Sequence, residues 1–207
     1  MIKIYGFQFT RSTRATWALE EAGAEYEFIP VNLAKGEHRK LEFLKVNPGG
    51  KVPVLVDNDF VLTESAAICT YIGEKFPASG LVPSEINARA HYYQWCFFAM
   101  SELETPLWTM RKHIQILPEE LRVPTVANSC IWEFQRAATL LEKHLKDREY
   151  VVNDHFTAAD ILLAATLNWA IKAEVQLKSP ILESYANRIT TRPALFRARE
   201  REAITIT

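Results

Sequence analysis

The sequence predicts two domains of different structural class: an α/β domain over residues 1–76 and an all-helical domain over residues 84–207. Three observations lead to this prediction. Strand-like and helix-like patterns alternate through the first 76 residues. The segment "PASGLVP", residues 77–83, then interrupts the pattern with two prolines and a glycine, and we interpret it as a linker. After this segment strand patterns almost disappear.

The first domain has the predicted order β-α-β-α-β-β-α. A helix between the first two strands favours a parallel pairing of these strands, because such crossovers rarely connect antiparallel neighbours. Two apolar runs around Asp57-Asn58-Asp59 predict a hairpin, and Gly23 is a natural stop for the first helix. The segments, in order, are "IKIYGF" (2–7), "TRATWALEEAG" (13–23), "YEFIPV" (26–31), "EHRKLEFLKV" (37–46), "VPVLVDNDFVLTES" (52–65) and "ESAAICTYIGEKF" (64–76).

The second domain has three long helical patterns, over residues 86–113, 125–147 and 156–175. The third begins with a capping signal, since Thr157 is a good N-cap residue and Asp160 can reach back to its backbone N–H. We expect this signal to be structural.

Composition excludes several functions. The net charge of −1 gives the chain no overall attraction to nucleic acid or to anionic lipid. No apolar run approaches the ~18 residues that a membrane span needs, and Lys3 interrupts any N-terminal signal peptide. The three scattered cysteines fit a reduced cytoplasm, and their spacing is not that of a zinc site.

The segment "NPGGKVPVLV", residues 47–56, places Pro53 where a strand begins. Its peptide bond with Val52 has two interpretations. A trans bond after a glycine turn is the ordinary one. A cis bond would turn the N–H and C=O of Val52 outward, where they can bind an extended peptide as an extra strand. The spacing does not decide between them.

These motifs, in this order, resemble those of the cytosolic glutathione transferases, in particular bacterial, phi-like and theta-like members. The resemblance covers nearly the whole chain. It implies a thioredoxin-like first domain, an all-helical second domain, a cis bond before Pro53, glutathione as co-substrate and no metal. The matching segments are "NPGGKVPVL", "LTESAAICTYI", "FTAADILLA" and "RPALFRARE".

The resemblance also implies the residues that hold glutathione. Ser65 begins a helix, where free N–H groups and its hydroxyl suit a carboxylate, and Glu64 can meet the ammonium. The backbone of Val52, ahead of Pro53, completes this part of the site. The alternative for Ser65 is a simple N-cap, and the two roles can coexist.

His38 and Arg39 lie where phi-like and theta-like members place groups near the glycyl carboxylate, and Lys51 can add a charge at the same end. The alternative is a solvated basic surface, because Lys35, Lys40 and Lys45 are nearby in the sequence.

The stretch "FQFTRSTRATWALEEAG", residues 7–23, carries the candidate thiol-activating hydroxyls. Serine-type members place this hydroxyl after the first strand, four residues before a basic helix residue. Aligned on Arg14, that position is Thr10, and Ser12 can substitute for it. A hydroxyl hydrogen bond favours the thiolate of a thiol whose pKa is otherwise near ~8.5. The alternative is that both hydroxyls only cap the helix.

The implied function is a cytoplasmic detoxification enzyme that activates the glutathione thiolate for attack on a hydrophobic electrophile. The expected assembly is a homodimer through residues 65–75 and 84–112. Two alternatives remain: another glutathione-dependent reaction, such as peroxide reduction, dehalogenation or isomerisation, and a non-catalytic binding or adaptor protein of the same fold.

Overall fold

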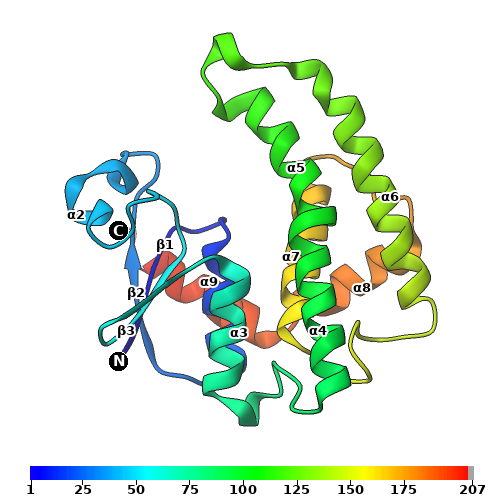
Figure 1. The fold of residues 1–207 in the computed structure, drawn as a ribbon, viewed down its shortest axis with the longest axis horizontal. Helices are drawn as coiled ribbons and strands as arrows, with labels where there is room; N and C mark the ends of the chain where they lie inside the picture. The colour runs from blue at the N-terminus through cyan, green and yellow to red at the C-terminus, as the bar shows by residue number, and fades with distance from the viewer. Residues whose placement is uncertain (205–207) are drawn as a thin grey trace. The chain divides into compact units, whose positions relative to one another are not determined.

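A computed structural model describes residues 1–204 of the chain (Figure 1). The chain forms two compact units. The first contains Met1–Val82 together with the C-terminal segment that starts at Thr191, and the second is Pro83–Thr190.

The first unit is built on a four-stranded sheet with the strand order β2-β1-β3-β4. Strand β1 (Ile2–Gly6) pairs in parallel with β2 (Tyr26–Pro30). It pairs antiparallel with β3 (Val54–Asp57), which in turn pairs antiparallel with β4 (Phe60–Thr63). The predicted parallel pair and the predicted hairpin are both confirmed.

Helices cover this sheet, and the predicted α/β order is confirmed. Apolar side chains of the strands and helices form the core, and Ile4, Trp17, Leu55 and Ile72 are almost completely buried. The helical segments are α1 (Ser12–Glu21), the 3-10 turn Glu37–Arg39, α2 (Leu41–Leu44), α3 (Ser65–Lys75), the 3-10 turn Pro77–Ser79 and α9 (Pro193–Ile204).

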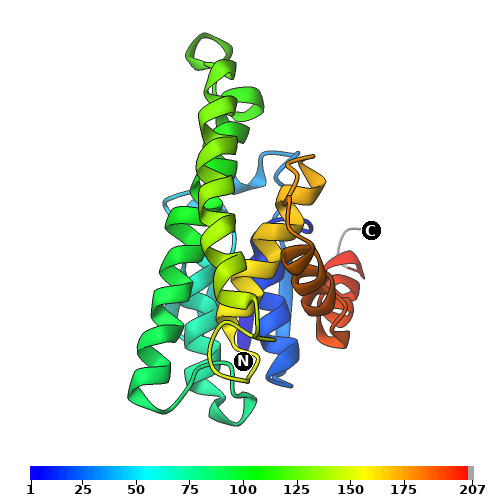
Figure 2. The same ribbon diagram turned by 90° about the vertical axis from the view of Figure 1, so that its right-hand side faces the viewer.

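Helix α9, which lies within the expected range 84–207 of the helical domain, belongs to the first compact unit. This helix, red in Figures 1 and 2, packs on α1. Ion pairs connect α1 with α9 and with the residue that precedes α9. Arg192 pairs with Glu21 at 2.6 Å, and Arg197 and Arg201 pair with Glu20 at 3.0 and 2.8 Å.

The segment 77–83 is also more than a linker, since its last part packs into the first unit. Leu81 and Val82 are buried. They pack so closely on Gly73 of α3 that a Cβ at this glycine would lie 2.6 Å from Val82 Cγ2. A glycine is therefore required at this turn of α3.

The second unit is helical, as predicted. The first long helical pattern is realised as two α-helices, each followed by a π-helical turn. Helices α7 and α8 lie side by side in both views (Figures 1 and 2). The elements are α4 (Ile86–Phe98), the π-helix Ala99–Leu103, α5 (Glu104–Arg111), the π-helix Lys112–Ile116, the 3-10 turns Glu119–Leu121 and Pro124–Val126, α6 (Ala127–Leu145), α7 (Ala158–Lys172) and α8 (Pro180–Thr190).

Candidate functional site

The turn between β1 and α1 brings Ser12 against the end of the first strand. A Cβ at Gly6 would lie 2.7 Å from Ser12 Cβ, so only glycine allows this approach. Ser12 is the first residue of α1 and is completely buried. Its Oγ accepts a hydrogen bond from the backbone N–H of Phe7 at 3.2 Å. Ser12 therefore ties the helix to the strand that precedes it.

Thr10 lies in the same turn and is partly exposed. Its Oγ1 donates to the carbonyl oxygen of Phe7 at 2.6 Å and lies 2.9 Å from Ser12 Oγ. It also accepts the backbone N–H of Ser12 at 3.2 Å, which satisfies one free N–H at the start of α1. A hydroxyl has one proton to donate. The Thr10 hydroxyl can therefore redirect its donated hydrogen bond from Phe7 O to an incoming anion. It would still accept the hydrogen bond from the N–H of Ser12.

The start of α3 places a second hydroxyl at a helix N-terminus. Ser65 is the first residue of α3 and is 2% exposed. Its Oγ lies 3.3 Å from Nη1 of the buried Arg14 of α1, which donates to it. The residue before it, Glu64, is exposed and has a φ of 67°. The N-cap position belongs to Glu64, and no side chain caps this helix.

The peptide bond between Val52 and Pro53 is cis, so the second of the two interpretations is confirmed. Within residues 1–204, neither the N–H nor the C=O of Val52 makes a hydrogen bond. Asn47 holds the preceding loop, because its Nδ2 donates to Lys51 O at 2.8 Å and its Oδ1 accepts Gly49 N–H at 2.9 Å.

A hollow of about 360 Å³ lies beside this loop and brings three predicted residues together: His38, Arg39 and Lys51. Its other lining residues are Leu44, Pro48, Gly49 and Gly50. Nδ1 of His38 is buried and has no hydrogen-bond partner among the described residues. The three residues therefore line one hollow, where their basic side chains could provide donors for an anion.

All nine predicted site residues lie in the first unit. Two residues that organise the site were not singled out as site residues. Arg14 served only to align the hydroxyls, although its guanidinium reaches Ser65. Asn47 fixes the loop before Val52, and its position in "NPGG" is a typical turn signal that could have identified it.

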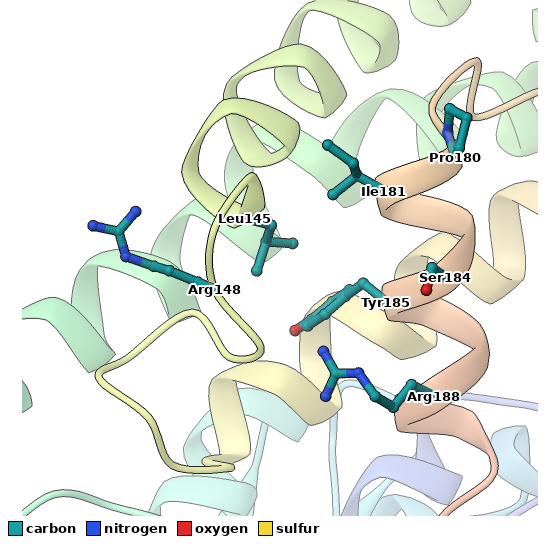
Figure 3. Close-up of a pocket in the computed structure, with 7 residues that line it drawn as sticks. All are labelled: Leu145, Arg148, Pro180, Ile181, Ser184, Tyr185 and Arg188. Atoms are coloured by element: carbon teal, nitrogen blue, oxygen red, sulfur yellow. The ribbon is translucent and has the colours of Figure 1, made fainter.

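A second hollow, of about 320 Å³, lies in the helical unit between the end of α6 and α8 (Figure 3). Tyr185 points into the space between the two helices, whereas the guanidinium of Arg148 points away from α8. The Tyr185 hydroxyl donates to Asp160 Oδ1 at 2.8 Å, and Asp160 also accepts the backbone N–H of Thr157 at 2.9 Å. This hollow therefore borders the predicted capping interaction of α7.

Within residues 1–204, no helix combines the length and the apolar character that a bilayer crossing requires. In the same part of the chain, no three metal-ligating side chains gather into a group that could hold a metal ion.

Comparison with known proteins gives matches over both units. Residues 1–74 match the family "Glutathione S-transferase, N-terminal domain", and residues 132–201 match "Glutathione S-transferase, C-terminal domain". A zeta-class glutathione S-transferase from Euphorbia esula is 34% identical over 175 residues, which cover 82% of this chain and 76% of the relative.

Solved structures give the same result. A glutathione S-transferase from Xylella fastidiosa superposes with a TM-score of 0.88 at 26% identity and covers 98% of this chain and 99% of its own. Glutathione transferase URE2P6 from Phanerochaete chrysosporium, solved in complex with oxidized glutathione, has a TM-score of 0.85 at 28% identity, over 99% of this chain and 97% of its own. The chain therefore belongs to the glutathione S-transferase family, whose enzymes use glutathione as co-substrate.

Proposed function

We propose that this enzyme activates the thiol of glutathione as a thiolate at the start of α1, with Thr10 as the hydrogen-bond donor. The observation that carries the proposal is the position of Thr10 Oγ1. It accepts the N–H of Ser12 at 3.2 Å and has one proton, now donated to Phe7 O. Transfer of this hydrogen bond to sulfur stabilises the thiolate, and the N-terminus of α1 contributes its dipole.

Ser12 has a supporting role in this proposal. It is completely buried, and its Oγ already accepts the N–H of Phe7. From there Ser12 can donate its own proton to Thr10 Oγ1 at 2.9 Å, which leaves Thr10 free to donate to sulfur. Ser12 thus orients Thr10 without contacting the ligand.

Ser65, in the same proposal, binds a glutathione carboxylate. Its Oγ accepts from Arg14, so its own proton remains available for the ligand. The free N–H groups at the start of α3 and the buried positive charge of Arg14 favour an anion at this point. The exposed carboxylate of Glu64, next to Ser65, is placed to receive the ligand ammonium.

The other end of glutathione extends along the loop that ends at Pro53. The unpaired N–H and C=O of Val52 can bind the ligand backbone like a neighbouring strand. His38, Arg39 and Lys51 around the nearby hollow suit the second carboxylate. The same proposal includes a relationship of this enzyme to the phi and theta classes, because His38 and Arg39 lie where those classes place groups near the glycyl carboxylate.

The reaction we propose is transfer of glutathione to a hydrophobic electrophile. The thiol loses its proton to solvent, the sulfur forms a bond to carbon, and the leaving group departs with the electron pair. A detoxification role follows from this chemistry. A cytoplasmic location suits the chain because its three cysteines are buried free thiols.

Two experiments test the proposed function. Isothermal titration should give saturable binding of glutathione, and absence of binding at millimolar glutathione would overturn the proposal. An assay with an aryl halide should then show glutathione-dependent release of halide. Binding without turnover of halides, peroxides or isomerisation substrates would instead favour the non-catalytic alternative.

A homodimer is the assembly we propose, with α3 and α4 as the contact helices. Helix α4 exposes large apolar side chains, with Ile86 78% and Phe97 70% exposed. Closed twofold pairs are the commonest assembly of soluble proteins. Sedimentation at micromolar concentration should give twice the mass of the chain, and a monomer would contradict the proposal.

A further inference from the structure

A buried carboxyl group that the proposed chemistry does not use lies between α9 and the first turn of α1. Glu202 is 1% exposed. Its Oε2 accepts from the hydroxyl of Thr13 at 2.9 Å, and its Oε1 accepts from the hydroxyl of Thr16 at 2.7 Å. Both carboxyl oxygens are therefore engaged by the helix that begins at Ser12.

Thr13 connects this carboxyl to the candidate thiol site. Its backbone N–H donates to the carbonyl oxygen of Thr10 at 3.3 Å, so one residue contacts Glu202 through its side chain and Thr10 through its backbone. Any change in the bonds of Glu202 therefore acts on the turn that carries Thr10 and Ser12.

The buried surroundings of Glu202 raise the pKa of its carboxyl toward neutral pH. Burial raises the pKa of this carboxyl to about 7, while the hydrogen bonds from Thr16 and Thr13 and the charge of Arg199 act in the opposite direction. Helix α9 packs on α1 and on β2. Among the described residues, β2 contributes Tyr26, whose pKa is raised first by burial, then by Glu20, and least by Glu202.

Helix α1 contributes two further buried charged groups, and both are engaged elsewhere. Glu20 is paired with Arg197 and Arg201 of α9, and Arg14 donates to Ser65 of α3. A change in the protonation of Glu202 therefore changes the charge beside the first turn, where a thiolate would also lie.

We propose that Glu202 is a positioning residue for thiol activation, which holds the first turn of α1 through the hydroxyls of Thr13 and Thr16 and couples the charge of that turn to pH. The part of this inference that concerns the thiol rests on the proposed function. Ionised Glu202 places a negative charge at the positive end of α1, where it disfavours a second anion. Protonated Glu202 favours the thiolate.

The first test follows backbone amide resonances by nuclear magnetic resonance in the ligand-free protein. The resonances of Thr13 and Thr16 should shift with pH with a midpoint of about 7. Glu202→Gln keeps the size of the side chain and should abolish this titration. Thr13→Val removes one stabilising bond of the carboxylate and should raise the midpoint.

Glu21→Gln is the matched control, because it removes one carboxylate from the same pair of helices at the opposite end of α1. It should leave the titration of Thr13 and Thr16 unchanged. An unaltered titration in Glu202→Gln would overturn the proposal, and so would its loss in Glu21→Gln.

The second test measures the thiol pKa of bound glutathione by ultraviolet absorbance above pH 7. Glu202→Gln should lower it by ~0.2–0.7 unit, the size of a charge effect at a helix end. An unchanged or raised thiol pKa would overturn the coupling while the proposed function stood. Failure of the wild-type protein to bind glutathione would overturn the proposed function, whereas the amide titration would still decide whether Glu202 holds the turn.

Discussion

Two helix N-termini in the first unit, those of α1 and α3, begin with a buried serine but have opposite electrostatic surroundings. Ser12 of α1 is bound to its own loop through Phe7 and Thr10, and the carboxyl of Glu202 contacts the same turn. Ser65 of α3 accepts from the guanidinium of Arg14.

The difference indicates what each end can bind. A permanent positive charge beside Ser65 suits a carboxylate, which is an anion at any neutral pH. The start of α1 has hydroxyl donors and a carboxyl group whose charge depends on pH, which suits a thiol that must change between neutral and anionic forms. We therefore expect the start of α3 to bind a carboxylate and the start of α1 to adjust the charge of the thiol.

The largest expected effect concerns Glu202 and stability. Because burial raises its pKa from 4.5 to about 7, the folded state holds this proton more tightly than the unfolded state. Stability should therefore fall as pH rises from about 4.5 to 7, by on the order of 3 kcal/mol. Urea unfolding at pH 5 and pH 8 should show that Glu202→Gln lacks this loss. An equal loss of stability in the wild-type and Glu202→Gln proteins would contradict a raised pKa of Glu202.

Removal of the α3 hydroxyl should weaken the binding of glutathione. Ser65→Ala should cost roughly 1–3 kcal/mol of binding free energy, because a hydrogen bond to a charged carboxylate is lost. Calorimetric titration measures it. Ser101→Ala, which removes an exposed helical hydroxyl that donates to Phe97 O, is the matched control. Equal affinities of all three proteins would remove Ser65 from the site.

The hydroxyls of Thr10 and Ser12 should differ in their contribution to the free energy of unfolding. Ser12→Ala leaves the partly buried N–H of Phe7 without its acceptor and should lower the free energy of unfolding by about 1–2 kcal/mol. Thr10→Ala should cost less, because Thr10 is partly exposed to water. A larger loss of stability in Thr10→Ala would reverse the structural roles of the two residues.

Much of the fold could be predicted because its signals are local. The hairpin turn at Asp57-Asn58-Asp59 and the extent of α3 are visible in short stretches of sequence. The place of α9 was missed because it depends on pairs distant in sequence, such as Glu21 with Arg192. The tight contact of Val82 with Gly73 likewise depends on the folded arrangement.

The candidate site was predictable only in part, for the same reason. Motifs singled out Pro53 and Ser65 as candidates, and the cis bond at Pro53 is confirmed. No local pattern could show that Arg14 reaches Ser65 or that Glu202 meets Thr13, because 51 and 189 residues separate the partners. The position of Ser12 against the first strand depends in the same way on its close packing at Gly6.

The central claim is that Thr10, and not Ser12, donates the hydrogen bond that activates the thiol. Its most direct test is the ultraviolet titration of glutathione bound to wild-type, Thr10→Ala, Thr10→Ser and Ser12→Ala proteins. Thr10→Ala should raise the thiol pKa by ~1 unit, equivalent to ~1.4 kcal/mol, Thr10→Ser should leave it nearly unchanged, and Ser12→Ala should shift it less. A larger shift in Ser12→Ala, or no shift in either alanine variant, would contradict the claim.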